Sequence, residues 1–148
     1  MYRRYVLRDL KFKMKASGLD AAFKSFLHYF RNVEEINIKG MENIEDAFIA
    51  FDFGIIQDDT GDIVALEAIN FEMPDWFLLF LKSIEEYVEE GSIIKLYYED
   101  DGIMREFVFY DKCFEHFRKD ESIILNEYIP SEEEEKHKPN YMLLSRCE

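Results

Sequence analysis

Apolar and polar residues alternate near the start of the chain. Leu10, Phe12, Met14 and Ala16 are separated by Lys11, Lys13 and Lys15. A period of two is typical of a β-strand with one face in water. The sequence therefore predicts a strand over residues 10–16 with a lysine face.

The period changes after residue 17 and predicts an amphipathic helix over residues 18–33. Apolar residues recur there at spacings of three and four, with Ser17 placed as the N-cap. We expect the apolar stripe to lie on a sheet; it consists of Leu19, Phe23, Phe26, Leu27 and Phe30.

Two hairpins are predicted further along the chain. Residues 47–57 and 62–72 are joined by Asp58-Asp59-Thr60-Gly61, and residues 92–98 and 103–111 by Glu99-Asp100-Asp101-Gly102. Asp and Gly tolerate the positive φ that tight hairpin turns need. Ile49, Phe51, Phe53 and Ile55 alternate against Asp52 in the first hairpin, and a short strand is expected before it at residues 36–39.

A second helix is predicted over residues 74–90, between the two hairpins. Pro74 suits a first helical turn and Gly91 suits a terminator. Its apolar residues form a broad surface: Trp76, Phe80, Ile84, Tyr87 and Val88 lie on one stripe, and Phe77, Leu78, Leu79 and Leu81 spread around the first two turns. This half of the helix is therefore either buried on several sides or partly exposed.

The resulting order, β-α-β-β-α-β-β with a further strand candidate at residues 122–129, indicates an α+β fold. We expect a mainly antiparallel sheet of about five to six strands with two helices packed on one face. Residues 1–130 form the single predicted domain, and residues 131–148 an acidic loop and C-terminal tail, whose apolar residues 141–144 could pack back onto the domain.

Composition supports a folded protein. The 148 residues include 14 Phe and 9 Tyr, whereas disordered chains are poor in aromatic residues. The two cysteines, Cys113 and Cys147, are expected as free thiols. No apolar run approaches the ~20 residues that span a membrane, and lysines stand where an export signal would be apolar, so the expected location is the cytoplasm.

Charge is distributed unevenly along the chain. The first 40 residues hold nine Lys and Arg against four Asp and Glu, and the remainder holds nine against 28. An acidic surface attracts basic partners and repels phosphate. We therefore expect a basic protein partner and no direct nucleic-acid binding.

Motifs for catalysis, metal ions or cofactors are weak, and we expect no cofactor and no bound metal. The acidic stretch Asp58–Asp62 has the register of a hairpin turn instead of a calcium loop. Cys113, His116 and His137 lack zinc-ligand spacing. Asp52 and Glu67 could meet Lys95 and Arg105 on an open sheet face as structural pairs, or alternatively form the acidic pocket of an enzyme.

Together these features predict a non-enzymatic protein-binding inhibitor, with the general character of immunity proteins that neutralise basic toxins or nucleases. Acids would steer a basic partner and aromatic side chains would anchor it. The predicted partner-binding residues are Glu85, Glu86, Glu89, Glu90, Glu99, Asp100, Asp101, Trp76, Phe77 and Phe80. The alternatives are a homo-oligomeric structural or ligand-sensing module, with a homodimer as its simplest form, and an enzyme with an acidic open-face pocket.

Overall fold

Two antiparallel sheets and three α-helices make up the fold in the computed structural model, which describes residues 6–8, 11–68, 74–98, 102–120 and 141–145. Strands β1, β4, β5, β6 and β7 form one sheet in that order, and β2 pairs with β3 in the other. The elements are β1 Val6–Arg8, η1 Ala16–Gly18, α1 Leu19–Phe30, α2 Ile44–Ala50, β2 Gly54–Gln57, β3 Ile63–Glu67, α3 Phe77–Ile84, η2 Glu85–Tyr87, β4 Ile93–Tyr98, β5 Ile103–Tyr110, β6 Cys113–Asp120 and β7 Tyr141–Ser145.

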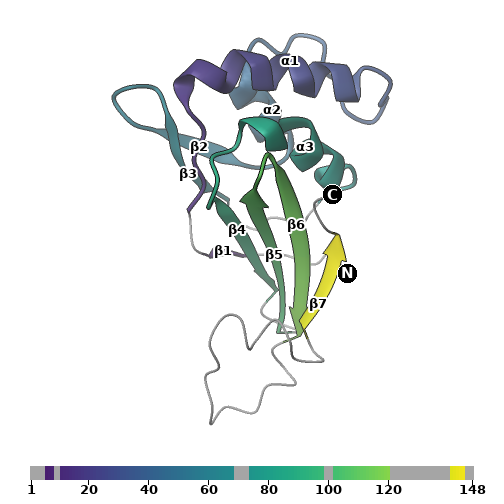
Figure 1. Ribbon diagram of the computed structural model, residues 1–148. Helices are drawn as coiled ribbons and strands as arrows, with labels where there is room; N and C mark the ends of the chain where they lie inside the picture. The colour runs from purple at the N-terminus through teal and green to yellow at the C-terminus, as the bar shows by residue number, and fades with distance from the viewer. Residues whose placement is uncertain (1–5, 9–10, 69–73, 99–101, 121–140, 146–148) are drawn as a thin grey trace.

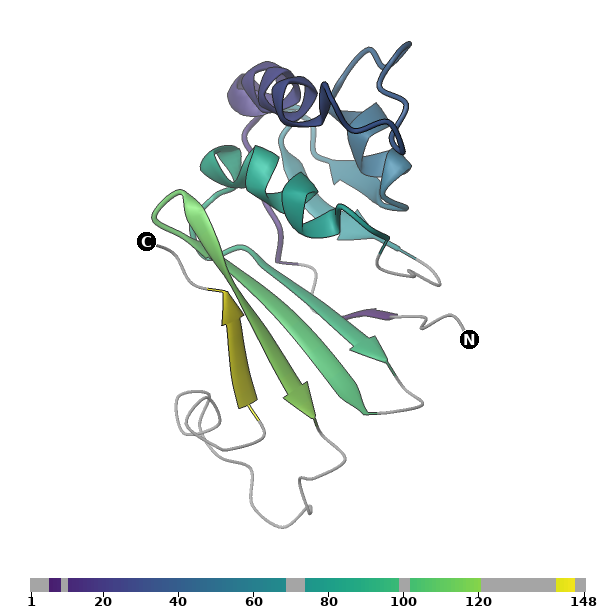
Figure 2. The same cartoon turned by 90° about the vertical axis from the view of Figure 1, so that its right-hand side faces the viewer.

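The predicted α+β class is confirmed, and the layers are visible in Figures 1 and 2. Helix α3 lies next to the five-stranded sheet, and α1 lies beyond α3 on the same side. The stripe of α1 meets other helices rather than a sheet: the Phe26 ring lies 5.9 Å from that of Phe80 in α3. The predicted pair of helices on one side is thus arranged in two successive layers.

Residues 11–15 connect the two sheets. Met14 and Ile63 of β3 exchange backbone hydrogen bonds of 3.0 and 2.8 Å, and the amides of Glu89 and Ile93 donate to the carbonyls of Lys13 and Lys11. Phe12 and Met14 are each 1% exposed while the three lysines are exposed, so the predicted alternation is right. Within this segment only Met14 forms β-bridges, to Ile63 and Val88, so the regular strand predicted here is not formed.

Helix α2 replaces the start of the first strand of the predicted first hairpin, at residues 47–50. Ile44, Ala47, Phe48 and Phe51 recur at spacings of three and four, and all four are buried. Asn43 caps the helix because its Oδ1 accepts a 3.2 Å bond from the Asp46 amide, and the Asp46 carboxylate accepts from the Glu42 amide at 2.8 Å. This paired capping stabilises helix over strand.

Replacing Asn43 with alanine should lower the free energy of unfolding by about 1 kcal/mol, because the Asp46 amide would lose its side-chain acceptor. Chemical denaturation of the two proteins measures the difference. Asn37→Ala, in the connection before α2, is the matched control: its Oδ1 accepts only the Lys39 amide in an exposed turn. A loss as large in the control would contradict the capping role.

The hairpins and turns agree in part with the predictions. β2–β3 and β4–β5 form, and Asp58 builds the first turn: its Oδ1 accepts from the Thr60 hydroxyl at 2.6 Å and from two amides. The Thr60 hydroxyl bond is the main cause that lowers the pKa of Asp58.

Strand β6 was not predicted. It follows β5 through Asp111 and Lys112, both at positive φ, so the turn carries no glycine signal.

Element ends differ from the predictions in several places. Ser17 lies in η1 and is not a helix cap, since α1 begins after Gly18. Residues 36–39 form no strand. The second helix is shorter than predicted, with α3 at Phe77–Ile84 followed by η2. The strand candidate at residues 122–129 falls outside the described residues, and residues 141–145 form the edge strand β7.

Cys113 is disulfide-bonded, which corrects the expectation of free thiols. The chain has one other cysteine, Cys147, two residues after β7. Cys113 begins β6, and β6 pairs with β7. The sequence did not indicate this bond, because two widely spaced cysteines form no recognisable disulfide pattern.

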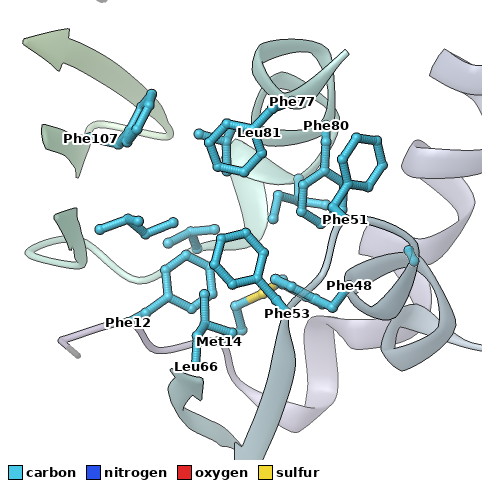
Figure 3. Packing of buried hydrophobic residues seen from close by; sticks show 14 of the residues in the cluster. Phe12, Met14, Phe48, Phe51, Phe53, Leu66, Phe77, Phe80, Leu81 and Phe107 are labelled. Carbon is cyan, nitrogen blue, oxygen red and sulfur yellow. The ribbon is translucent and has the colours of Figure 1, made fainter. Parts of the chain in front are cut away.

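The core is a cluster of phenylalanine rings around α3 (Figure 3). Phe80 is fully buried; its ring stacks on that of Phe51 at 4.5 Å and meets those of Phe48 and Phe26 edge-on at 5.1 and 5.9 Å. On the sheet side, Phe77 contacts Phe107 at 5.4 Å. Helix α3 therefore joins α1 and α2 to the five-stranded sheet.

Candidate functional site

The exposed side of the segment 75–90 carries three of the seven predicted partner-binding residues that the structure describes, namely Trp76, Glu86 and Glu90. Leu78, Lys82 and Glu86 follow one another at spacings of four, and all three are exposed. Spacings of four place side chains on one face of a helix. Asp75 and Trp76 precede this row and are also exposed. The apolar Trp76 and Leu78 therefore lie near the beginning of this side, and the acids Glu86 and Glu90 lie at its end.

Trp76 is held in an unusual backbone conformation. It precedes α3 with φ at 72°, in the left-handed region, and is 41% exposed. Its carbonyl accepts a 2.8 Å bond from the Phe80 amide, and the next residue, Phe77, is buried in the core. A bulky residue at positive φ is costly and uncommon. Trp76 is thus presented to solvent on a rigid support.

Phe77 and Phe80 are not available as partner anchors, which corrects the prediction. They are 1% and 0% exposed, and both rings point into the cluster in Figure 3. Leu78 was not predicted as a site residue, yet it is 42% exposed. Because the helix begins at Phe77 instead of Pro74, Trp76 lies outside it, and α3 itself turns Leu78 outward and Phe80 inward.

The predicted acids occupy different environments. Glu85 is 9% exposed, and its Oε1 lies 2.8 Å from Nζ of Lys82, so this acid is engaged within the chain. Glu86 and Glu90 are exposed and Glu89 is half-buried. Glu99, Asp100 and Asp101 lie outside the described residues. Of the predicted acids that the structure describes, Glu86 and Glu90 are the exposed ones.

The lysines of residues 11–15 lie beside part of the acidic cluster. A groove of about 350 Å³ is lined by Lys11, Lys13, Glu89, Glu90, Gly91 and Ser92. The Lys13 amide donates to Oγ of the buried Ser92 at 3.0 Å, which holds the two segments together. The charge asymmetry of the sequence is therefore partly balanced in space at this groove.

The four residues expected on one open sheet face do not share a sheet. Asp52 follows α2 at φ 64° and Glu67 ends β3, and both are exposed. Lys95 and Arg105 belong to β4 and β5 of the five-stranded sheet. The cross-strand pairing proposed for these four residues is therefore wrong.

A buried histidine lies on the helix-facing side of the five-stranded sheet. His116 is 3% exposed and its ring stacks on that of Phe107 at 4.4 Å. Arg105 Nη1 lies 3.2 Å from His116 Nε2. Burial, and secondly the charge of Arg105, lower the pKa of His116 from 6.5 to about 4. His116 is therefore neutral at pH 7, with Nε2 accepting a hydrogen bond from the guanidinium.

Other chemical features are few in the part of the chain that the structure describes. A hollow of about 530 Å³ in the α1–α2 connection is lined by residues 30–34 and 36–39, including Arg31, Lys39 and Glu34. Its mixed charges favour no one ligand class. Among the described residues no group of three or more His, Cys, Asp or Glu could hold a metal ion. Likewise, no described helix has the length and apolar character to cross a membrane.

Comparison with known proteins does not assign the chain to a family, because no family model, curated protein or solved structure matches it.

Proposed function

We propose that this protein is a non-enzymatic binding protein that neutralises a basic protein partner by occluding its functional surface. The observation that carries the proposal is the exposed Trp76, held at positive φ beside the exposed Leu78. Tryptophan is among the residues most often found at the energetic centre of protein interfaces. Strained backbone is concentrated at functional positions.

Rigidity supports the role of Trp76 as an anchor. Phe77 is fixed by contacts with Phe53 and Phe107, at 5.8 and 5.4 Å between ring centroids. An anchor presented on a fixed backbone loses little conformational freedom when a partner binds, which favours affinity. Leu78, the residue after Phe77, extends the apolar surface around Trp76.

The acids supply attraction over distance. The chain has a net charge of −14, and Glu86 and Glu90 are exposed on the same segment as Trp76. Opposite charge accelerates encounter, and salt screens it over ~8 Å at physiological ionic strength. Lys11 and Lys13 lie beside Glu90 and weaken the negative electrostatic potential there. We therefore assign the long-range attraction of the partner to the net charge of the protein, and the orientation of the partner to Glu86.

Capture of interacting proteins with the tagged chain, at low and moderate salt, tests the proposal. We expect one basic protein, with an association rate that falls as salt rises. Trp76→Ala should weaken its binding about 30-fold or more, the effect of losing a typical interface anchor. Ile49→Ala, which removes a 57% exposed apolar side chain from α2, is the matched control and should leave binding unchanged.

Charge is tested separately. Glu86→Lys should slow association, whereas Glu34→Lys, which changes net charge equally at an exposed site in the α1–α2 connection, should slow it less. Equal affinity for the Trp76 and Ile49 variants, or an association rate that does not respond to salt, would reject the proposed surface.

A further inference from the structure

Two arginines lie directly opposite one another in the five-stranded sheet. Arg105 of β5 and Arg118 of β6 are Cα partners in an uninterrupted antiparallel pairing. Residues that are directly opposite in such a pairing point to the same face, with Cβ atoms about 4.5–5.5 Å apart. Both side chains are half-buried. We call these two residues the arginine pair.

The arginine pair lies on the helix-facing side of the sheet. Side chains alternate along a strand, so Arg105 shares the face of Phe107, and Arg118 shares the face of His116. Phe107 contacts Phe77 of α3 at 5.4 Å, which identifies this face. Figures 1 and 2 show that β6 begins beside α3 and ends far from it, and Arg118 is two residues from that end. The arginine pair therefore lies beyond α3 on this face.

No acid accompanies the arginine pair among the described side chains of β5 and β6 on this face. The other described side chains there are Ile103, Phe107, Phe109, Phe114 and His116. Arg118 forms no hydrogen bond or ion pair with any residue that the structure describes. Like charges directly opposite one another destabilise a sheet. An anion between the two guanidinium groups would remove this repulsion.

His116 orients the guanidinium of Arg105. Arg105 Nη1 lies 3.2 Å from His116 Nε2, and the imidazole is itself buried and stacked on Phe107. A guanidinium has five N–H donors, so this contact is compatible with a further acceptor. Guanidinium groups bind oxyanions through pairs of N–H donors, and a side chain that is oriented in advance loses less entropy on binding.

We propose that the arginine pair is a binding site for a phosphoryl group, either as free inorganic phosphate or as part of a small organic phosphate. A phosphoryl group carries a charge of about −2 and three acceptor oxygens, which matches two guanidinium groups. A carboxylate has one charge and two oxygens, which suffice for one arginine. The net charge of −14 repels polyanions such as nucleic acids, so the phosphoryl group belongs to a small molecule. The site is separate from the surface around Trp76, which belongs to another element.

Isothermal titration calorimetry of the full chain with inorganic phosphate and with phenyl phosphate, at constant ionic strength, tests the site. Arg118→Gln should weaken the binding of both at least about 10-fold, the effect of losing hydrogen bonds to a charged group. Lys112→Gln removes the same charge from the exposed turn before β6 and, as the matched control, should bind like the original protein. Tighter binding of phenyl phosphate would identify an organic phosphate as the ligand, and equal binding would identify free phosphate.

The urea midpoint gives a second measurement. In chloride without phosphate, the midpoint of Arg118→Gln should equal or exceed that of the original protein, because the substitution removes the repulsion between like charges. Phosphate should raise the midpoint of the original protein more than that of Arg118→Gln, since a ligand stabilises the state that binds it.

Four outcomes would overturn the proposal. The first is that neither phosphate binds. Equal weakening in the Arg118 and Lys112 variants would show a general effect of charge. Acetate that binds as tightly as phosphate would show that the arginine pair does not select a dianion. A lower urea midpoint of Arg118→Gln in chloride would show that Arg118 supports the fold without an anion.

Discussion

Replacing Phe80 with alanine is expected to lower the free energy of unfolding by about 4 kcal/mol, the largest effect that we predict. The side chain is fully buried, and its ring contacts those of Phe26, Phe48 and Phe51 from α1, α2 and the residue that follows α2. Its loss would leave a cavity where three helices meet. Since natural domains are stable by roughly 5–15 kcal/mol, much of the stability would be removed.

Urea denaturation followed by circular dichroism measures this effect without relying on the single tryptophan. Trp76→Ala is the control, with an expected change of about 0.5 kcal/mol, because the side chain is exposed and its packing is limited. Similar losses in both variants would contradict the assignment of Phe80 to the core and Trp76 to the surface.

Acidification should destabilise the protein through His116. Burial lowers its pKa from 6.5 to about 4, so the folded state resists a proton that the unfolded chain accepts. The contribution of neutral His116 to the free energy of unfolding is complete above pH 6.5 and is lost as pH falls toward about 4. At about 1.4 kcal/mol for each pH unit, the loss over this range is about 3 kcal/mol. A protonated ring would also direct an N–H at the Arg105 guanidinium.

His116→Gln isolates this effect, because glutamine does not titrate and its Oε1 can accept the hydrogen bond from Arg105. Urea midpoints measured from neutral pH down to about 4 should fall less steeply in this variant than in the original protein. His28→Gln, at an exposed position of α1, should retain the original slope. If His116→Gln retained it as well, His116 would not be the group responsible.

Local sequence patterns correctly predicted the elements whose own residues show a clear hydrophobic period or a turn motif. Helix α1 has a clear period, and the β4–β5 hairpin has an Asp-Gly turn. Helix α2 was assigned to a strand because Phe51 and Phe53 alternate with Asp52, although Ile44, Ala47, Phe48 and Phe51 also fit a helix. Phe51 fits both periods, so the apolar pattern alone is ambiguous here, and the Asn43 cap favours the helix.

The candidate site was less predictable, because it depends on where one helix begins. Starting the helix at Pro74 places Trp76 and Phe80 on one stripe, whereas the actual start at Phe77 separates them. Burial then follows from packing between distant segments: Phe80 meets α1 and α2, and Phe77 meets β5. Such contacts produce no periodic pattern in the sequence.

The position of residues 11–15 between β3 and the start of β4 determines when the fold can be completed. Lys13 donates to Ser92, 79 residues later in the chain, and Met14 pairs with both Ile63 and Val88. A chain that leaves the ribosome from its N-terminus exposes Phe12 and Met14 long before these partners exist. The two sheets are therefore joined only after β4 has emerged. A fragment ending at β3 would lack β4, the strand that completes its core.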